Sequence, residues 1–209
     1  MVYKNLYYRL FFSLFFLGIY FISLYNKYLL FIFGTIIYLI VFYEVLNFFK
    51  KFFKLILSYL ILSYFCFTLY FFIFFDFIIF NLFIISIVLF DSFSYFIGKF
   101  FGKINILKII SPKKTLEGYL GGIFFTNVSF FTYFYLFKNE TNIYNLTTLI
   151  NLTIFISIIG DFIESYFKRQ NNIKDSSKFL PGHGGYFDRF DSFIASIIML
   201  TLFQFITNL

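Results

Sequence analysis

Carboxylates inside long apolar segments are the side chains of this sequence best suited to hold a cation. Asp161 and Glu164 lie three residues apart near the end of one such segment, so on a helix they share a face. An ionised side chain at the centre of a bilayer costs about 2.5–3.5 kcal/mol even on lenient insertion scales. Several acids at one level therefore need a polar cavity that contains cations. The acids in or beside apolar segments are Glu44, Asp91, Asp161, Glu164, Asp188 and Asp191.

The chemistry of these acids favours Mg²⁺ as the cation. Mg²⁺ is a hard cation that keeps several waters and bridges carboxylates to substrate phosphates. We expect a functional role for Asp161 and Glu164, because the pair directly precedes a charged loop. For Glu44 we expect a structural role only, in which it pairs with a loop lysine or extends to the membrane surface.

A first polar loop, Gly98–Gly122, contains residues that could bind phosphate. Ser111–Thr115, followed by Glu117 and Gly118, is typical of a turn that leads into a helix N-terminus. Backbone N–H groups at such a terminus, together with Lys113 and Lys114, would form a phosphate cradle. No Walker A loop is present in the sequence. A pair of lysines beside a membrane can also serve only as topological charge or as a contact for lipid headgroups.

A second polar loop, Gly160–Ser192, contains the single histidine, His183, within the segment Pro181–Gly185. The glycines of that segment allow unusual backbone angles and close approach to a ligand. One histidine without partners cannot form a zinc site, so the residues alone favour a structural role for His183. The single cysteine, Cys66, excludes an intrachain disulfide and a cysteine-based zinc site.

The composition predicts a membrane protein. Of the 209 residues, 61% are hydrophobic, and the mean hydropathy is +0.87. A soluble domain of this length could not bury so much apolar surface in its own core. A spanning helix needs about 20 mainly apolar residues. The predicted spans are Leu6–Tyr25, Tyr28–Phe49, Leu55–Phe75, Phe77–Ile97, Gly118–Phe137, Leu146–Phe167 and Phe190–Thr207.

We therefore expect an all-α, polytopic membrane bundle of about seven transmembrane helices with a cytoplasm-facing polar cavity. Residues 1–90 would supply N-terminal transmembrane helices, and residues 91–209 would form a catalytic transmembrane region with two cytoplasmic polar loops. The apolar segment Leu10–Leu24 follows Lys4 and Arg9 as in a signal peptide, but no small-residue cleavage site follows it, so we expect an uncleaved first span.

The basic residues predict the orientation of this bundle. Of the 17 lysines and arginines, all but Lys27 and Lys138 fall at the N-terminus or in the second, fourth and sixth connections between the predicted spans. By the positive-inside rule, the N-terminus and both polar loops face the cytoplasm. This distribution explains the net charge of +7 as topology and gives no reason to expect a nucleic-acid partner.

The segment Ser165–Asp191 resembles the signature of the phosphatidate cytidylyltransferase family, also called CDP-diacylglycerol synthases. The pattern runs Ser-x-apolar-Lys-Arg, four residues, Lys-Asp, then Leu-Pro-x-His-Gly-Gly, and finally Asp-Arg-apolar-Asp. The segments "SPKKTLEGYLGG" and "DSFSYFIGKFFGK" also look like this family, so the resemblance covers Asp91–Asp191. The sequence departs from the family in Tyr186, where an aliphatic residue or Phe is usual, and in its short N-terminal region.

The resemblance implies transfer of a cytidylyl group from CTP to phosphatidic acid with a divalent metal, giving CDP-diacylglycerol and pyrophosphate. It implies metal ligands among Asp161, Glu164, Asp175, Asp188 and Asp191. It implies catalytic roles for Lys168, Arg169, Lys174, Asp175 and His183. It implies substrate binding by Asp91, Ser111, Lys113, Lys114, Thr115, Glu117, Gly182, Gly184, Gly185 and Arg189. The cofactor would be Mg²⁺, with a second, monovalent cation left open.

The expected setting is a bacterial inner membrane with the active site at the cytoplasmic face, and a homodimer is left open. An alternative is a CTP-dependent cytidylyltransferase for another lipid phosphate. A different class is a cation transporter, but its acids should extend to both faces or the midplane, whereas here the other halves of the spans are nearly free of charge. A CDP-alcohol phosphatidyltransferase is disfavoured because its acidic motif is absent, and a purely structural protein would not need the two polar loops.

Overall fold

The computed structural model is almost entirely helical, which confirms the predicted all-α membrane bundle. It describes residues 14–15, 17–22, 24–107, 111–137, 143–180 and 184–207. The main helices are α2 (Lys27–Phe48), α3 (Phe53–Leu69) with its π-helical extension η1 (Tyr70–Phe74), α4 (Phe77–Phe101), α5 (Leu116–Phe137), α6 (Ile143–Gln170) and α7 (Phe187–Thr207).

Five of the described helices are long and apolar enough to cross a membrane, namely α2, α3 with η1, α4, α6 and α7. They coincide with five of the predicted spans. The predicted span Gly118–Phe137 is also a helix, α5, but it is not among these five. Most of the predicted span Leu6–Tyr25 lies outside the described residues.

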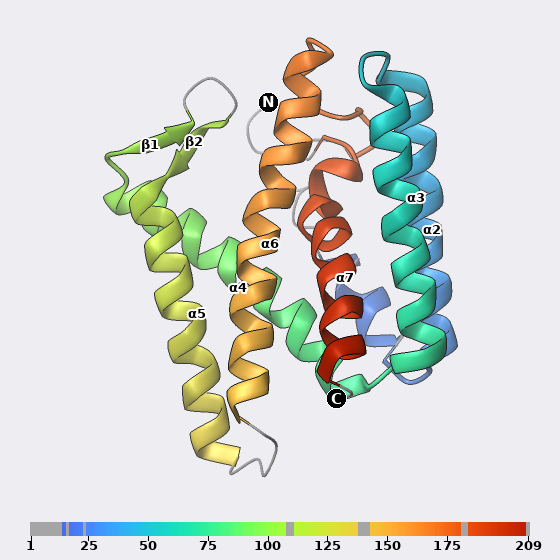
Figure 1. Cartoon of the computed structure of the whole chain (residues 1–209). Coiled ribbons are helices and arrows are strands. Elements are labelled where there is room, and N and C mark those ends of the chain that lie inside the picture. Colours follow the sequence, from blue (N-terminus) through green and yellow to red (C-terminus); the bar gives the residue numbers. More distant parts are fainter. Residues whose placement is uncertain are drawn as a thin grey trace.

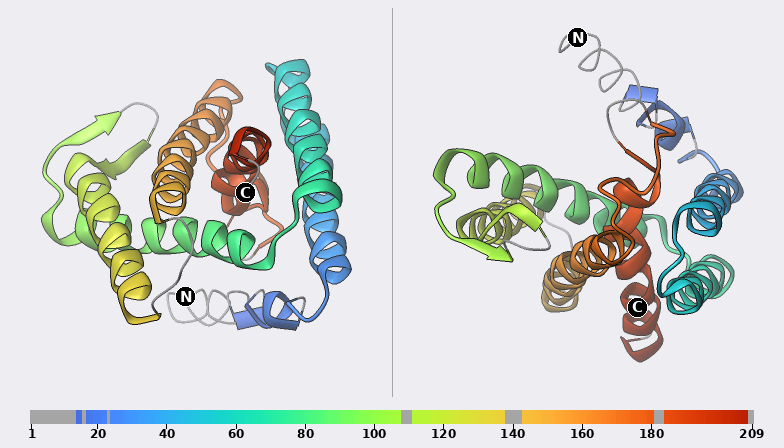
Figure 2. Two further views of the ribbon diagram at one scale, coloured as in Figure 1. Left: turned by 60° about the horizontal axis from the view of Figure 1, so that its bottom comes forward. Right: turned by 90° about the horizontal axis from the view of Figure 1, so that it is seen from above.

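Helix α4 runs obliquely across the other helices and joins the two halves of the bundle (Figures 1 and 2). Its residues Phe80, Phe83 and Ile87 pack into a core shared with α2, α3 and α7. Its residues Leu82 and Phe90 pack into a second core shared with α5 and α6. The predicted division after residue 90 thus falls inside α4, and this one helix positions residues of both cores.

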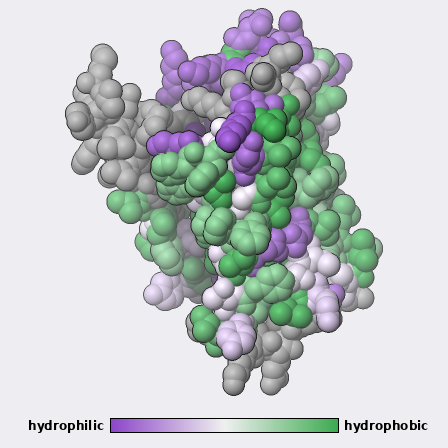
Figure 3. Space-filling model, turned by 90° about the vertical axis from the view of Figure 1, so that its left-hand side faces the viewer, coloured by the Kyte–Doolittle hydropathy of each residue, from purple (hydrophilic) through white to green (hydrophobic). Residues whose placement is uncertain are grey.

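Both polar loops lie at the same end of the bundle, opposite the C-terminal end of α7 (Figure 1). Hydrophilic side chains gather at this end on the face that Figure 3 shows, while hydrophobic side chains cover the middle of that face. At the opposite end, Asp76 forms the tight turn between η1 and α4 and caps α4 by accepting a hydrogen bond from the Ile79 N–H at 2.9 Å.

The first polar loop folds as a β-hairpin, which corrects the expected turn at Ser111–Thr115. Strand β1 (Asn105–Leu107) pairs antiparallel with β2 (Ser111–Thr115), and β2 leads directly into α5. Pro112 lacks an N–H group, which a strand with a free edge tolerates. The carboxylate of Glu117 accepts hydrogen bonds from the Lys103 and Ile104 N–H groups at 3.0 and 3.2 Å, so the start of α5 holds the chain that enters β1.

The second polar loop is tied to the connection between α2 and α3. The side-chain oxygen of Asn171 accepts hydrogen bonds from the Lys50 and Lys51 N–H groups at 2.8 and 2.7 Å. The side-chain amide of Asn171 donates to the Lys51 carbonyl at 3.2 Å. These bonds join two segments 120 residues apart in sequence and hold the second polar loop at the end of α2.

Candidate functional site

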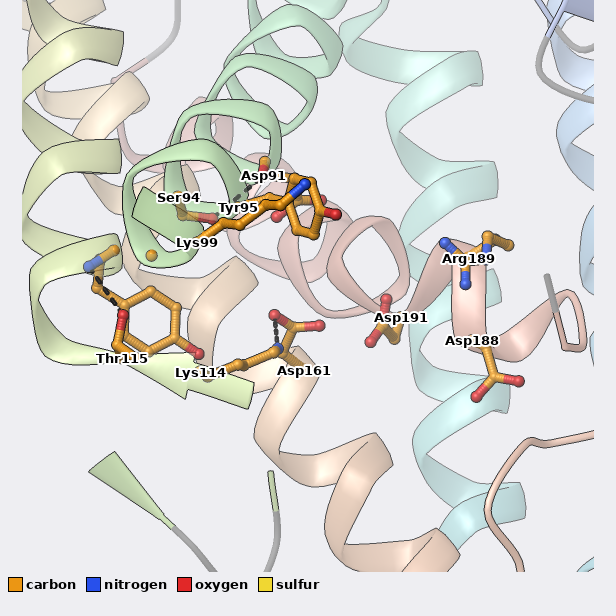
Figure 4. A pocket seen from close by; sticks show the side chains of 13 residues that line it. Asp91, Ser94, Tyr95, Lys99, Lys114, Thr115, Asp161, Asp188, Arg189 and Asp191 are labelled. Carbon is orange, nitrogen blue, oxygen red and sulfur yellow. Dashed lines mark hydrogen bonds and ion pairs between the residues drawn. The ribbon is translucent and has the colours of Figure 1, made fainter. Parts of the chain in front are cut away.

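A cavity of about 680 Å³ opens at the end of the bundle that contains the polar loops. Residues from α4, β2, α5, α6 and α7 line it, so it depends on both cores (Figure 4). The sequence-predicted residues among its lining are Asp91, Lys114, Thr115, Asp161, Asp188, Arg189 and Asp191. The structure thus brings together acids from three helices and a lysine from the hairpin.

Lys114 and Asp161 form an ion pair across this cavity. Lys114 extends from β2 toward α6, and the two side chains are 27% and 20% exposed (Figure 4). Burial lowers the pKa of Lys114, but the negative charge of Asp161 outweighs that effect and leaves the pKa raised. Lys114 is therefore positively charged at neutral pH, on the wall of the cavity.

Asp191, on the first turns of α7, lies next to Asp161. Its side chain is 7% exposed, and it accepts a hydrogen bond from the Ser192 N–H at 2.9 Å. Two neighbouring carboxylates repel each other unless they share a proton or a cation. Asp161 and Asp191 are thus the two acids of the cavity best placed to share a cation.

A second charged cluster lies behind the cavity and is centred on Lys168. Its ammonium group is 2.6 Å from both the Glu164 and the Asp188 carboxylates. The other oxygen of Glu164, Oε1, is buried and has no hydrogen-bond partner among the described residues. Lys168 and Glu164 do not line the cavity, so the structure places the predicted catalytic lysine in an ion-pair network beside it.

The Asp188 carboxylate is surrounded by protein donors. Its Oδ2 atom accepts hydrogen bonds from the Ser176 and Gly185 N–H groups, both at 2.8 Å, and its Oδ1 atom faces Lys168. In this structure Asp188 fixes the start of α7, since Gly185 lies just before that helix. The expected role of Asp188 as a metal ligand stays a prediction.

The structure also corrects the expectation for Glu44. Among the described residues it forms no ion pair with a loop lysine, and it does not extend to the membrane surface. Its side chain is fully buried, at 0% exposure. Four donors of the second polar loop bond to it: the Ser176 and Ser177 hydroxyls and the Tyr186 and Phe187 N–H groups. Sequence alone could not show this, because the donors lie more than 130 residues away.

The expected backbone cradle at the start of α5 is engaged elsewhere. The Leu116 N–H donates to the Ile104 carbonyl at 2.8 Å, and the Gly118 N–H donates to the Thr115 hydroxyl at 3.2 Å. The Glu117 carboxylate bonds to the chain before β1 and does not line the cavity. In this structure the hairpin therefore presents the side chain of Lys114, and the first N–H groups of α5 stabilise the hairpin itself.

Several predicted residues lie outside the cavity or outside the described residues. Among those described, Ser111, Arg169, Lys174, Asp175, Gly184 and Gly185 do not line it. Arg169, Lys174 and Asp175 are exposed, and Gly184 adopts a φ of 86°. Gly182 and His183 lie outside the described residues, as does the side chain of Lys113.

The sequence reasoning missed four side chains that line the cavity, namely Ser94, Tyr95, Lys99 and Tyr119. Ser94 and Tyr95 follow Asp91 by three and four residues, so the helical period that places Asp91 on the cavity also places them there. Gly118 provides the close contact between α4 and α5, because an added Cβ would lie 2.8 Å from the Ser94 carbonyl oxygen. This glycine serves helix packing.

The residues present fit a Mg²⁺ ion that is shared with a substrate. Within the described part of the chain, no three His, Cys, Asp or Glu side chains lie close enough to hold a metal ion by themselves. Mg²⁺ does not require such a set, since it is usually bound by one or two carboxylates and completed by water and substrate phosphates. The adjoining carboxylates of Asp161 and Asp191 match that donor set.

Comparisons with known proteins identify the family of the chain. Residues 2–207 match the model of the cytidylyltransferase family. The chain is 41% identical over 120 residues to the phosphatidate cytidylyltransferase of Haemophilus influenzae, an alignment that covers 55% of this chain and 41% of that protein. It is 38% identical over 117 residues to that of Staphylococcus aureus strain COL (54% and 44% covered) and 41% identical over 106 residues to that of Aquifex aeolicus (51% and 39%).

These alignments cover less than half the length of each relative. The family model, in contrast, matches nearly the whole chain, including the helices that precede the two polar loops. Both findings confirm the resemblance inferred from the motif in Ser165–Asp191. The chain belongs to the cytidylyltransferase family.

Proposed function

We propose that this membrane protein is a phosphatidate cytidylyltransferase, which converts CTP and phosphatidic acid to CDP-diacylglycerol and pyrophosphate. The relatives that carry this name support the proposal. In the reaction, a phosphate oxygen of phosphatidic acid attacks the α-phosphorus of CTP. The bond from that phosphorus to the α–β bridging oxygen breaks, and pyrophosphate leaves with the electron pair.

The observation that carries the proposal is the meeting of Lys114, Asp161 and Asp191 in one cavity at the polar end of the bundle. Lys114 comes from a polar loop, where a water-borne triphosphate can reach it. Asp161 and Asp191 come from α6 and α7, which are apolar enough to cross a membrane, and lie toward the ends of these helices nearest the second polar loop, where the headgroup of a membrane lipid could reach them. A cavity of about 680 Å³ is large enough for a nucleotide-sized ligand.

The residues of the chain would act mainly by positioning the phosphates and neutralising their charge. The attacking phosphate is already an anion at neutral pH, so the reaction does not need a strong general base. Lys114 would bind the triphosphate and stabilise the charge that develops on the leaving pyrophosphate. Arg189 and Lys99 also line the cavity and would add positive charge around the substrate phosphates. Holding both phosphates in one cavity lowers the entropic cost of their encounter.

Mg²⁺ is part of the proposal. Asp161 and Asp191 would hold it together with phosphate oxygens of the substrate. When bound, the ion would supply Lewis-acid stabilisation of the phosphate charges. We further propose that the cavity faces the cytoplasm of a bacterial cell, with the protein in the inner membrane, because the basic residues concentrate at the end where the cavity opens.

The proposal is tested by supplying the purified protein with CTP, phosphatidic acid and Mg²⁺ in mixed micelles. CDP-diacylglycerol and pyrophosphate should form in equal amounts, and omission of either substrate should prevent both. Diacylglycerol in place of phosphatidic acid should give no product, because it lacks the attacking phosphate. Absence of product with every lipid phosphate supplied would contradict the proposal.

A further inference from the structure

The buried carboxylate of Glu44 has a different environment from the acids of the cavity. Each of its two oxygens accepts two hydrogen bonds: Oε1 from the Ser177 hydroxyl at 2.6 Å and the Tyr186 N–H at 2.8 Å. Oε2 accepts from the Ser176 hydroxyl at 3.1 Å and the Phe187 N–H at 2.9 Å. Donors that bond to an ionised carboxylate stabilise its charge. Glu44 is thus held as an acceptor for a set of donors that all belong to the second polar loop.

Two of these donors lie at the start of α7: the N–H group of Phe187, its first residue, and that of Tyr186, the residue before it. The N–H groups at the start of a helix have no partner within the helix, and the helix dipole places positive charge there. A capping side chain usually comes from the helix itself or from the residue before it. Here α2 supplies the cap for Tyr186 and Phe187 across 142 and 143 residues of sequence. Glu44 on α2 therefore helps to fix the position of the start of α7.

The same bonds connect Glu44 to the cavity through Ser176. The Ser176 hydroxyl lies 3.1 Å from the Glu44 carboxylate and 3.1 Å from the Asp188 carboxylate, so it bridges the two acids. Asp188 lines the cavity, and so do Arg189 and Asp191 on the same turn of α7. A shift at Glu44 would thus move three residues that line the cavity.

The space around Glu44 is closed. A Cβ atom added to Gly185 would lie 2.7 Å from both Glu44 carboxylate oxygens and would overlap the Ser176 hydroxyl. This contact gives Gly185 a reason to be glycine that involves Glu44 and no ligand. Gly184, with its φ of 86°, precedes it and closes the segment by accepting a hydrogen bond from the Leu180 N–H at 2.9 Å.

We propose that Glu44 is a positioning residue that sets the second polar loop and the first turn of α7 for nucleotide binding, through Ser176, Ser177 and the Tyr186 and Phe187 N–H groups. The proposal rests on the proposed function. On this proposal the affinity of the site for CTP depends on Glu44, which lies on α2 and outside both polar loops.

The test is the kinetics of Glu44→Gln in the full chain. Glutamine keeps the shape of the side chain, but its NH₂ group is itself a donor, so it cannot accept the hydrogen bonds that one carboxylate oxygen of Glu44 accepts. We expect the KM for CTP to rise about tenfold or more, because charge-assisted hydrogen bonds are lost at the start of α7. The KM for phosphatidic acid should rise by a smaller factor, because Asp91 and Asp161 of the cavity belong to α4 and α6 and are not among the groups that bond to Glu44.

Asp76→Asn is the matched control. Asp76 also caps a helix with its carboxylate, but it does so for α4 at the opposite end of the bundle. This variant should lower thermal stability and leave both KM values unchanged. Ser177→Ala, which removes one donor to Glu44 and leaves the carboxylate in place, should raise the KM for CTP by a smaller factor and keeps the test open if Glu44→Gln fails to fold. Combined with Glu44→Gln, Ser177→Ala should add little further effect.

The inference and the proposed function fail in distinguishable ways. If the wild-type chain forms no CDP-diacylglycerol, the proposed function is wrong. If the wild-type chain is active but Glu44→Gln and Ser177→Ala keep the wild-type KM for CTP, Glu44 does not position the nucleotide site. Equal loss of kcat/KM for both substrates, in proportion to the fraction of folded protein, would also overturn the inference.

Discussion

Lys114 on β2 and Asp161 on α6 form an ion pair that joins the hairpin to the membrane-spanning helices (Figure 4). The pair places a permanent positive charge and a carboxylate side by side on the cavity wall. A triphosphate with its metal ion carries negative and positive charge side by side, so its phosphates could meet Lys114 while its metal ion meets Asp161. The pair is thus complementary to the proposed substrate, and it is also a tertiary contact that holds the hairpin in place.

This dual role gives a prediction for the Lys114→Met variant. Loss of the ammonium group leaves Asp161 partly buried without its partner, which should cost about 1–3 kcal/mol of stability. Activity should also fall, because a phosphate ligand is lost. The double variant Lys114→Met with Asp161→Asn should recover most of the stability and none of the activity. Thermal unfolding in detergent and the product-formation rate separate the two effects, and a double variant as unstable as Lys114→Met would contradict this account of the pair.

Lys168 is predicted to matter more for stability than an exposed lysine does. It is 12% exposed and lies between the buried carboxylates of Glu164 and Asp188. Lys168→Met would leave both without their cation, and breaking a buried ion pair in this way costs about 3–5 kcal/mol. Lys54→Met, at an exposed position of α3, is the control and should change the unfolding temperature little. Similar unfolding temperatures for the two variants would show that the cluster does not stabilise the fold.

Gly118 is predicted to set the width of the cavity. A Cβ at this position would lie 2.8 Å from the Ser94 carbonyl oxygen and 3.1 Å from the Gly98 Cα atom, and backbone atoms cannot rotate away. Gly118→Ala should therefore push α4 and α5 apart and destabilise the protein by about 1–3 kcal/mol. Gly18→Ala is the control, because a Cβ there meets no atom within 4 Å. Equal stability of the two variants would contradict the close packing of α4 on α5.

Removal of divalent metal should stop the reaction. After treatment with EDTA, product formation should fall to about 1% or less, since metal stabilisation of phosphoryl charge contributes several kcal/mol. Added Mg²⁺ should restore the rate, whereas K⁺ alone should not. Undiminished product formation from metal-depleted protein would contradict the assignment of a metal to Asp161 and Asp191.

Hydropathy alone predicted the helices well, because membrane-spanning helices must satisfy their backbone internally and be apolar outside. The predicted span Tyr28–Phe49 differs from α2 by one residue at each end. The predicted span Phe77–Ile97 is shorter than α4, which continues through Lys99 to Phe101. A single charge at the membrane surface does not end a helix, so hydropathy underestimates helices that extend beyond the apolar layer.

The site was predictable only where it follows from depth and helical period. The similar depths of Asp91, Asp161 and Glu164 in their segments indicated that they could share a cavity; Asp91 and Asp161 line one, but Glu164 does not. The partners of Glu44 and Asp188 depend on how α2, the second polar loop and α7 pack, which no local pattern encodes. The hairpin was missed for a different reason: Leu107 pairs with Ser111 only four residues away, but strand propensity depends strongly on context and did not indicate a strand in so short a segment.

The central claim is that the chain transfers a cytidylyl group, and the fate of labelled phosphate tests it most directly. Purified protein is supplied with phosphatidic acid, Mg²⁺ and CTP that is radiolabelled in either its α- or its γ-phosphate. The account predicts that the α-label enters the lipid and the γ-label leaves as pyrophosphate, and that Asp161→Asn abolishes both while remaining inserted in the membrane. Entry of the γ-label into the lipid, or label transfer by Asp161→Asn at the wild-type rate, would contradict it.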